Sequence, residues 1–587
     1  MRPSNRTPSR VSLLILCAAA LTASGIILGI LASSGAASPL RWPLLALLVP
    51  VLAALALSAL PSLFGLFAPR REAAPPRPSG ASRTALLMPI HNEDPDAVFA
   101  NIRVMREAIR AHGLGGIDMF VLSDTRDPAI AAAEERAWAD LRAEFGPPVR
   151  YRRRAGNAGR KAGNIAEFCD RWGARYDFMI VLDADSLMTA DAIAALIGAM
   201  EANPRAGIIQ TVPYPVNRET LFARMVQFGA RLHTPLWAEG AALWSGAAGN
   251  YWGHNAILRV APFMRHCRLP VLPGHGPFSG EILCHDVVEA ALMVRAGWQV
   301  LAMPRLDGSF EELPANLADY LGRERRWCQG NLQHLGFLRT AGLAAASRLH
   351  LLYGILYYLS GAATVALLAL ATIEPALFGG SSLLAGLHRA PGLALLGLVL
   401  VLSYGPKLLS LGAALCDARE ARRFGGRAAL LAGGIAELGF TVLTGPVMLW
   451  TTTRFVALTL AGRGIGWAAQ PRDDRGLGWR EARVHFGGPA LLGLGWAALL
   501  AGTAPGLLAW AAPLIAGLLA GVPLSVWTSR RDLGLRARRL GLFLTRDEIA
   551  PAPELRARRA AAWTAPALVP SGPSMAELAL SPAEAAE

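Results

Sequence analysis

The stretch FMIVLDADSLMTADAI, residues 178–193, places two aspartates at the end of an apolar run. Phe178 to Leu182 has the length and composition of a buried strand. Asp183 and Asp185 follow it, separated by one alanine. In an open α/β sheet, ligands bind beyond the carboxyl ends of the strands. These two carboxylates are therefore candidates for a ligand or metal site if the strand belongs to such a sheet.

From about Ser82 the chain alternates short apolar runs with amphipathic stretches. TALLMPI, IDMFVLS and VRYRRR predict strands, while AVFANIRVMREAIRAHG and the residues after GRKAGN predict helices. This alternation is typical of a mostly parallel sheet with helices on both faces. Glu93 and Asp124 follow two of these strands, so we expect them at the same sheet edge as Asp183 and Asp185.

The rest of the chain has the composition of a membrane protein. Of 587 residues, 53% are apolar, and they dominate before about residue 67 and after about residue 350. The net charge of +14 fits the basic cytoplasmic flanks of membrane helices better than a nucleic-acid partner. The six cysteines are scattered, and their spacing indicates neither a disulfide framework nor a zinc site.

Two apolar segments precede the α/β region. Val11–Leu31 and Pro43–Phe67 are each long enough to span a bilayer. A cleaved signal peptide is the alternative for the first segment. Arg70 and Arg71 after the second segment favour a hairpin of two retained helices, with both ends in the cytoplasm.

Four apolar stretches follow the α/β region. The arginine-rich segments on either side of the third stretch should both be cytoplasmic, which predicts that it crosses twice and turns near Gly445 and Pro446. The fourth should divide near Pro505. The sequence thus predicts six later spans and eight in all. The stretches are Leu349–Ile373, Leu393–Ala414, Ala428–Leu460 and Pro489–Trp527.

These patterns divide the chain into four parts. We predict two membrane helices, a cytoplasmic α/β domain, about six further spans with a cytoplasmic loop at 462–486, and a cytoplasmic basic segment with a disordered tail from Pro551. The boundaries are 1–70, 71–345, 346–528 and 529–587.

A phosphate-binding pattern lies just before the two aspartates. AGRKAGNIAEF places Arg160 and Lys161 beside glycines at a helix start, where exposed N–H groups and cationic side chains suit a diphosphate. Asp183 and Asp185 could hold Mg²⁺ together with substrate phosphates. An ordinary capped helix and an ordinary surface turn are the alternatives. In combination, the two patterns indicate a nucleoside diphosphate with its metal.

Seven ordered motifs identify a family resemblance. MPIHNE, LSDTRDP, GRKAGN, VLDADS, GHNAILR, CHDVVEAALMVRAGW and RERRWCQGN resemble the processive family 2 glycosyltransferases, relatives of cellulose and hyaluronan synthases. Their wording is similar to the glucosyltransferase H family, which makes osmoregulated periplasmic glucans. The resemblance implies an α/β GT-A glycosyltransferase domain with a mostly parallel sheet, inserted in a multi-span α-helical membrane protein.

The resemblance also implies roles for individual residues. Asp183 and Asp185 would hold a divalent cation, Mg²⁺ or Mn²⁺, with Asp185 the more direct ligand, and Asp124 would lie at the uracil. Lys161 would meet the diphosphate. The implied nucleotide-binding residues are Glu93, Asp124, Lys161 and Arg326.

Asp286 is the candidate general base. CHDVVEA stands where relatives carry Thr-Glu-Asp, so Cys284 and His285 depart from the pattern while Asp286 keeps it. The sequence alone favours a helix N-cap at Asp286. The motif order favours a base that takes the proton of the acceptor hydroxyl.

The implied acceptor-binding residues come from two motifs. In RERRWCQGN, Trp327 would offer an apolar face to a sugar, although Arg323 replaces the usual glutamine of QxxRW. An amphipathic basic helix on the membrane surface is the alternative. YWGHNAILR adds a second group. The four residues are Trp252, His254, Asn255 and Trp327.

The predicted function is elongation of a linear β-1,2-glucan from UDP-glucose by an inverting hexosyltransferase of the bacterial inner membrane, coupled to export. The alternatives are a synthase of another β-linked polysaccharide, such as cellulose, and a non-catalytic transporter with a degenerate nucleotide domain. The resemblance further implies contacts with membrane lipid, acyl carrier protein and a periplasmic glucan-modifying protein, and no nucleic acid. A lid over the nucleotide is expected from Trp467, Gln470 and Arg472.

Overall fold

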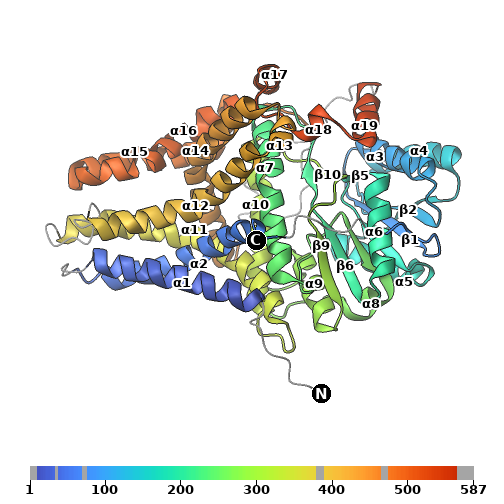
Figure 1. Ribbon diagram of the computed structural model, residues 1–587, viewed down its shortest axis with the longest axis horizontal. Helices are drawn as coiled ribbons and strands as arrows, with labels where there is room; N and C mark the ends of the chain where they lie inside the picture. Colours follow the sequence, from blue (N-terminus) through green and yellow to red (C-terminus); the bar gives the residue numbers. More distant parts are fainter. Residues whose placement is uncertain (1–9, 34–37, 69–75, 379–388, 465–472, 565–587) are drawn as a thin grey trace.

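The computed structural model describes residues 10–33, 38–68, 76–378, 389–464 and 473–564. A sheet-containing domain lies on one side, and long helices extend from it on the other (Figure 1). The predicted lid residues Trp467, Gln470 and Arg472 lie outside the described residues.

The domain is built on a seven-stranded sheet of order β3-β2-β1-β4-β8-β6-β9. β3, β2, β1 and β4 are parallel to one another, as are β6 and β9, and β8 runs antiparallel to both β4 and β6. The predicted mostly parallel sheet is therefore confirmed. The strands are β1 Thr84–Ile90, β2 Ile117–Ser123, β3 Val149–Arg153, β4 Phe178–Val181, β6 Ala206–Thr211, β8 Ala256–Arg259 and β9 Gln299–Met303.

A small second sheet of order β5-β10-β7 adjoins the main one. β10 is antiparallel to β5 and parallel to β7. Strand β10, which follows β9 in the chain, thereby lies beside β5, which follows Asp185. The strands are β5 Leu187–Met188, β7 Tyr214–Pro215 and β10 Ser309–Glu311.

Helices cover both faces of the main sheet, because side chains of each strand alternate between the faces. In β1, Leu86 and Met88 belong to the core under α3, α4 and α6, while Ala85 and Leu87 belong to the core under α5, α8 and α9. The bounds are α3 Pro95–Ala111, α4 Pro128–Phe145, α5 Arg160–Trp172, α6 Ala190–Ala202, α8 Val260–His266 and α9 His285–Arg295, with short turns η1 Gly173–Arg175 and η2 His334–Gly336.

Seven helices of the described residues are long and apolar enough to cross a membrane, as expected for a multi-span membrane protein. Two precede the domain and five follow it; α1 packs on α2, and the chain breaks between α15 and α16 near Pro505, as predicted. The helices are α1 Arg10–Ala32, α2 Arg41–Gly65, α11 Ala345–Phe378, α12 Ala390–Cys416, α14 Arg427–Leu460, α15 Trp479–Thr503 and α16 Leu508–Thr528, the last preceded by η5 Pro505–Leu507.

Helices α7 (Leu221–Ser245) and α10 (Leu317–Gln333) connect the domain to these helices. α7 touches α2 closely: a Cβ at Gly240 would overlap the carbonyl oxygen of Pro61. Glycine is needed here because two helix backbones meet.

Six of the seven helices extend away from the domain (Figure 1). α1 packs on α2, α2 also packs on α11 and α12, and α15 packs on α16. Each helix has one end beside the domain. The contacts or shared buried clusters at those ends are Arg10 with Leu243, Gly65 with Leu236, Ala346 with Trp244, Leu411 with Met225, and Phe486 and Val526 with Phe222.

The prediction that Ala428–Leu460 crosses twice is wrong. This stretch is one helix of 34 residues, α14, and Pro446 lies inside it. A proline removes one backbone hydrogen bond and kinks a helix, but it does not reverse the chain. Near its start Gly433 touches Phe228 of α7, and near its end Val456 shares a cluster with Cys328 of α10. Both ends of α14 therefore contact the domain.

The predicted disordered tail is also partly wrong. After α17 (Arg531–Arg539) and α18 (Arg546–Ile549), residues Pro553–Thr564 form α19 beside α3 (Figure 1). Leu555 of α19 is fully buried in the core of the main sheet. Burial of this apolar side chain overcomes the alanine- and proline-rich composition that predicted disorder. Residues 565–587 lie outside the described part of the chain.

Candidate active site

The predicted acidic residues lie at one sheet edge. Glu93, Asp124 and Asp183 follow β1, β2 and β4, which are parallel neighbours in the order β2-β1-β4. At the tip of β1, Asn92 adopts a left-handed conformation (φ 59°). Glu93 folds back, so that its carboxylate accepts a hydrogen bond from the backbone N–H of His91. The strand register thus brings these side chains together as predicted.

Asp124 is held by an arginine that the sequence did not single out. Arg154 donates to both carboxylate oxygens of Asp124, at 2.5 Å from Nε and 2.7 Å from Nη2. Asp124 is 5% exposed, so this is a nearly buried two-point ion pair. Arg154 also donates to the carbonyls of Ala158 and Arg160, which fixes the loop entering α5. In RYRRR nothing distinguishes the last arginine except its place at the strand tip.

A basic hollow of 400 Å³ lies beside this ion pair. It is bounded on one side by the end of β3 and on the other by the start of α5, and it is large enough for a small ligand. Arginines supply most of its charge, so an anionic ligand would be favoured there. Its lining residues are Arg152, Arg153, Arg154, Ala155, Gly156, Ala158, Glu167 and Arg171.

Lys161 links three parts of the site. Its ammonium group forms an ion pair with Asp183 and donates to the carbonyl of Gly253 at 2.8 Å. Helix α5 begins after Gly159, which adopts a left-handed conformation (φ 68°) and lies against Gly163. The glycines predicted to be important therefore permit the tight turn that presents Lys161 to the strand tips.

Asp185 lies beside a third carboxylate. Its side chain accepts from the backbone N–H of Glu312 at 3.3 Å, at the end of β10. The preceding residue, Glu311, is largely buried, with 22% of its side chain exposed. Burial raises the pKa of Glu311; His254, 3.5 Å away, opposes that shift, and Asp185 adds to it. Negative charge is thus concentrated around Asp185.

This concentration of carboxylates fits a divalent cation. Among the described residues no three His, Cys, Asp or Glu side chains converge as a complete metal cage. Mg²⁺ in nucleotide enzymes needs only one or two carboxylates, because substrate phosphates and water supply the other ligands. Asp183 and Asp185 meet that requirement, and a cation there would offset their mutual repulsion.

Asp286 lies in the first turn of α9 and is not its N-cap. The N-cap is Cys284, which makes no side-chain capping hydrogen bond. The alternative that Asp286 serves as a cap is therefore wrong. Gly253 adopts φ 87°, and a Cβ there would come within 3.3 Å of Asp286 Oδ2. The same glycine accepts from Lys161, so Asp286 lies next to the diphosphate-binding candidate.

The carboxylate of Asp286 is half-buried and available. Within the part of the chain that the structure describes, no hydrogen bond or ion pair engages it. Its neighbour His285 lies 3.1 Å from Glu289, one turn further along α9. Burial alone would lower the pKa of His285, but Glu289 raises it above 6.5. This pairing turns the imidazole toward Glu289 and leaves Asp286 free to act on a ligand.

Helix α10 packs on the start of α9 and brings the second acceptor motif close. A Cβ at Gly330 would overlap Cys284, and His334 Nε2 lies 3.0 Å from the Cys284 carbonyl. Trp327 is 42% exposed, and the guanidinium of Arg323 stacks over its ring at 4.5 Å. Arg323, which replaces the expected glutamine, thus fixes the tryptophan by a cation–π contact.

The other predicted acceptor residues divide into two groups. Trp252 is partly exposed and its ring lies 6.3 Å from that of Trp237, so it can meet a sugar. Asn255 is fully buried, and its amide donates to Ser309 Oγ and to the Phe310 carbonyl, both at 3.0 Å. The prediction that Asn255 contacts the acceptor is therefore corrected. Its amide instead holds β10, the strand that carries Glu311. Arg326 lies on α10, partly buried.

Two family models match the domain. The model described as Glycosyl transferase family 2 matches residues 85–267, and the one described as Glycosyl transferase family group 2 matches residues 178–379. Together they cover the sheet, the strand tips, Asp286 and the helices α10 and α11.

Named relatives match a longer part of the chain. Glucans biosynthesis glucosyltransferase H of Caulobacter vibrioides (strain NA1000 / CB15N) is 41% identical over 508 residues, 84% of this chain and 76% of that protein. The protein of the same name from Pseudomonas paraeruginosa (strain DSM 24068 / PA7) is 44% identical over 492 residues, 81% of this chain and 57% of that protein. The matched region thus spans little more than half the length of the Pseudomonas relatives.

Among solved structures, this chain is similar to the mannosyltransferase PcManGT from Pyrobaculum calidifontis in complex with GDP-Man and Mn²⁺, at 17% identity and a TM-score of 0.43. The match covers 67% of this chain and 97% of that chain.

Proposed function

The chain belongs to the glucans biosynthesis glucosyltransferase H family, with a family 2 glycosyltransferase domain, and from that premise we propose that it elongates a linear β-1,2-glucan from UDP-glucose. The observation that carries this proposal is the unpaired carboxylate of Asp286 beside Gly253 and Lys161. A binding-only domain has no need of a free carboxylate at that point.

The nucleotide would lie along the strand tips. Lys161, the start of α5 and Arg326 would face the diphosphate, and Glu93 and the Asp124–Arg154 pair would lie at the nucleoside. Because Arg154 donates to both carboxylate oxygens of Asp124, the uracil would meet a fixed ion pair rather than a free carboxylate.

Asp183 and Asp185 would hold a divalent cation, either Mg²⁺ or Mn²⁺. When bound, the cation offsets negative charge on the departing UDP. Lys161 adds a fixed positive charge at the same place, since it already contacts Asp183.

Asp286 would act as the general base. It takes the proton from the acceptor hydroxyl while that oxygen attacks the anomeric carbon of the donor glucose. The new glycosidic bond forms as the bond to UDP breaks, with inversion at that carbon. Trp252 and Trp327 would present ring faces to the acceptor sugars.

We further propose that the protein lies in the bacterial inner membrane with the domain in the cytoplasm. The basic segments after α12 and α16 both lie on the domain side, as the positive-inside rule requires for a cytoplasmic domain. The apolar helices that extend from the domain would provide the protected path that a polar glucan needs.

The metal proposal predicts strict dependence on a divalent cation. Excess chelator should abolish glucosyl transfer from UDP-glucose, and Mg²⁺ or Mn²⁺ should restore it. Asp185→Asn should remove transfer in purified, correctly inserted protein, because one of only two carboxylate ligands is lost. Full activity in excess chelator would contradict the assignment of Asp183 and Asp185.

Analysis of the product separates the alternatives. Only β-1,2 linkages support the glucan proposal, whereas β-1,4 linkages would indicate a cellulose-like synthase. A folded protein that binds UDP-glucose without any turnover would indicate the non-catalytic alternative.

A further inference from the structure

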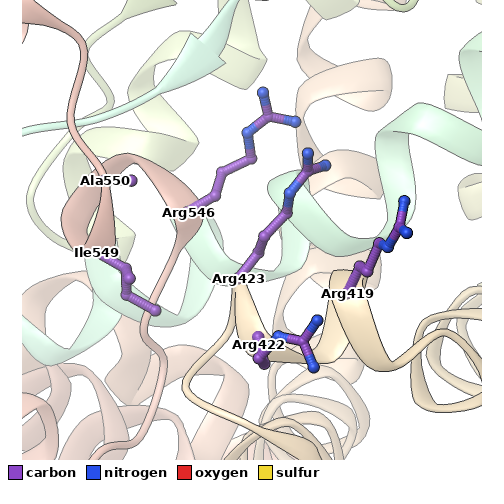
Figure 2. Close-up of a pocket in the computed structure, with 6 residues that line it drawn as sticks. All are labelled: Arg419, Arg422, Arg423, Arg546, Ile549 and Ala550. Carbon is purple, nitrogen blue, oxygen red and sulfur yellow. The ribbon is translucent and has the colours of Figure 1, made fainter.

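A second basic hollow lies away from the strand tips, at the end of a membrane helix. It has a volume of 390 Å³ and opens between α18 and α13 (Ala418–Arg422). Figure 2 shows four arginine side chains around it, three from α13 and the residue after it and one from α18. We call it the arginine pocket. Its lining residues are Arg419, Arg422, Arg423, Arg546, Ile549 and Ala550.

The positive charge of this pocket is only partly balanced. Arg423 pairs with Glu420 at 2.9 Å, and Arg546 pairs with Asp307. Arg419 and Arg422 are exposed, and neither has an ion-pair partner among the residues that the structure describes. Asp417 caps α13 by accepting from two backbone N–H groups. Asp547 and Glu548 of α18 pair with Arg231 and Arg224 of α7. The carboxylates of Glu420, Asp307 and Asp417 therefore leave the four arginines of the pocket with cationic charge in excess.

The pocket lies where a bilayer surface is expected. α12, one of the helices able to cross a membrane, ends at Cys416, and Arg419 follows three residues later. Phospholipid phosphates lie just outside the hydrocarbon core, at the depth of such helix ends. Ile549, which is 46% exposed, adds an apolar edge to the pocket. A free inorganic anion would not need such an edge, whereas the glycerol region of a lipid could use it.

Guanidinium groups match phosphate oxygens in pairs, and converging arginines are typical of phosphate recognition. We propose that the arginine pocket binds the phosphate group of an organic phosphate, and that the headgroup of an anionic phospholipid supplies it. The ligand would bridge the membrane helices, through α13, and the catalytic domain, through Arg546 and its partner Asp307.

The test uses the purified full-length protein in a neutral detergent. The midpoint of thermal unfolding is measured against increasing short-chain phosphatidylglycerol, phosphatidylcholine of the same chain length, or inorganic phosphate. A ligand that binds the folded state raises this midpoint in proportion to its affinity. We expect phosphatidylglycerol to raise it and phosphatidylcholine to leave it unchanged.

Matched double variants locate the effect. Arg419→Gln with Arg422→Gln should weaken the apparent phosphatidylglycerol affinity by about tenfold or more, because two charge-assisted contacts are lost. Arg536→Gln with Arg539→Gln removes equal charge from exposed positions of α17 and should bind like the parent. Both pairs are exposed, so the unfolding midpoint without ligand should match that of the parent.

Each outcome decides the proposal. Stabilisation by inorganic phosphate with the same dependence on Arg419 and Arg422 would support the phosphate site and identify a soluble source. Stabilisation by no phosphate compound, retention of the effect in the Arg419→Gln/Arg422→Gln protein, or equal loss in the Arg536→Gln/Arg539→Gln protein would overturn it.

Discussion

The ion pair between His285 and Glu289 sets the environment of the proposed base. Glu289 is 5% exposed at its side chain and His285 is 13% exposed, so the pair is shielded from solvent. The imidazole would otherwise be free to donate to Asp286, the adjacent residue. Pairing with Glu289 instead keeps the Asp286 carboxylate able to accept a proton from the substrate.

The same pair predicts a dependence of stability on pH. Because Glu289 raises the folded-state pKa of His285 above 6.5, the stabilisation is fully present below pH 6.5 and is lost as the pH rises through the folded pKa. Glu289→Gln should remove this contribution. Thermal unfolding midpoints of both proteins, measured from about pH 5.5 to 8.5 across the histidine range, should therefore converge toward high pH. Parallel curves would contradict the pairing.

Single residues were predictable where a motif fixed them and the backbone delivered them. Asp183 lies at the expected sheet edge because parallel strands end there. Lys161 contacts both Asp183 and Gly253, and Gly253 lies beside Asp286. The structural role of Asn255 could not be predicted, because no sequence pattern reveals that its amide donates to residues of β10, more than 50 positions away. Arg154 was missed for the same reason: its role depends on a contact 30 residues distant in sequence.

At the scale of elements, α14 decides the topology. If all seven apolar helices crossed the membrane, the segment after α16 would lie opposite the domain. Yet α17 contacts α7, with Arg531 of α17 paired to Glu219 just before α7. The conflict disappears if α14 lies along the boundary between domain and bundle, as its contacts with Phe228 and with the cluster of Cys328 indicate. Six crossings then remain.

This arrangement predicts the side on which two loops are exposed. The loop after α14 is anchored to the domain by Arg475, which pairs with Asp319 of α10 at 2.7 Å. In a Cys416→Ser background, Asp473→Cys should resist a membrane-impermeant thiol reagent in intact cells. Gly506→Cys, in the turn between α15 and α16, should react readily.

Permeabilised cells provide the control, because both cysteines should then be labelled. Labelling of Asp473→Cys in intact cells would contradict six crossings. The error in the sequence-based count has a physical origin. Positive charge predicts the side of a loop, but it cannot tell whether the helix between two loops crosses the membrane or returns along it.

At the scale of the whole molecule, the C-terminal segment fastens the membrane helices to the catalytic domain. Arg231 of α7 forms a two-point ion pair with Asp547 of α18, with both distances 2.7 Å. Arg224, about two turns earlier, pairs with Glu548 at 2.6 Å. Leu555 then enters the core of the sheet. The catalytic domain is therefore contacted by α18 and α19, which follow the last apolar helix in the sequence.

Loss of one buried partner should weaken this attachment. Asp547→Ala would leave Arg231, which is 4% exposed, without its main counter-ion. Breaking a buried pair in this way typically costs about 3–5 kcal/mol. We expect a clearly lower midpoint of thermal unfolding and faster proteolysis after α17.

Asp532→Ala is the matched control, because it removes an aspartate whose partner Arg530 is exposed. Its unfolding midpoint should stay near that of the parent, since exposed pairs contribute little. Equal effects of the two substitutions would contradict a structural role for the C-terminal segment. Composition suggested disorder here, and only tertiary contacts show otherwise.

If Asp286 takes the acceptor proton, replacing its carboxylate with an amide should slow glucosyl transfer without weakening donor binding. Glucosyl transfer and UDP-glucose affinity are measured for the parent and Asp286→Asn. Transfer should fall by about 10²–10⁴-fold, as expected for loss of a general base. Donor affinity should stay near that of the parent, because the proposed nucleotide contacts lie on other residues. A transfer rate close to that of the parent would contradict the assignment of Asp286.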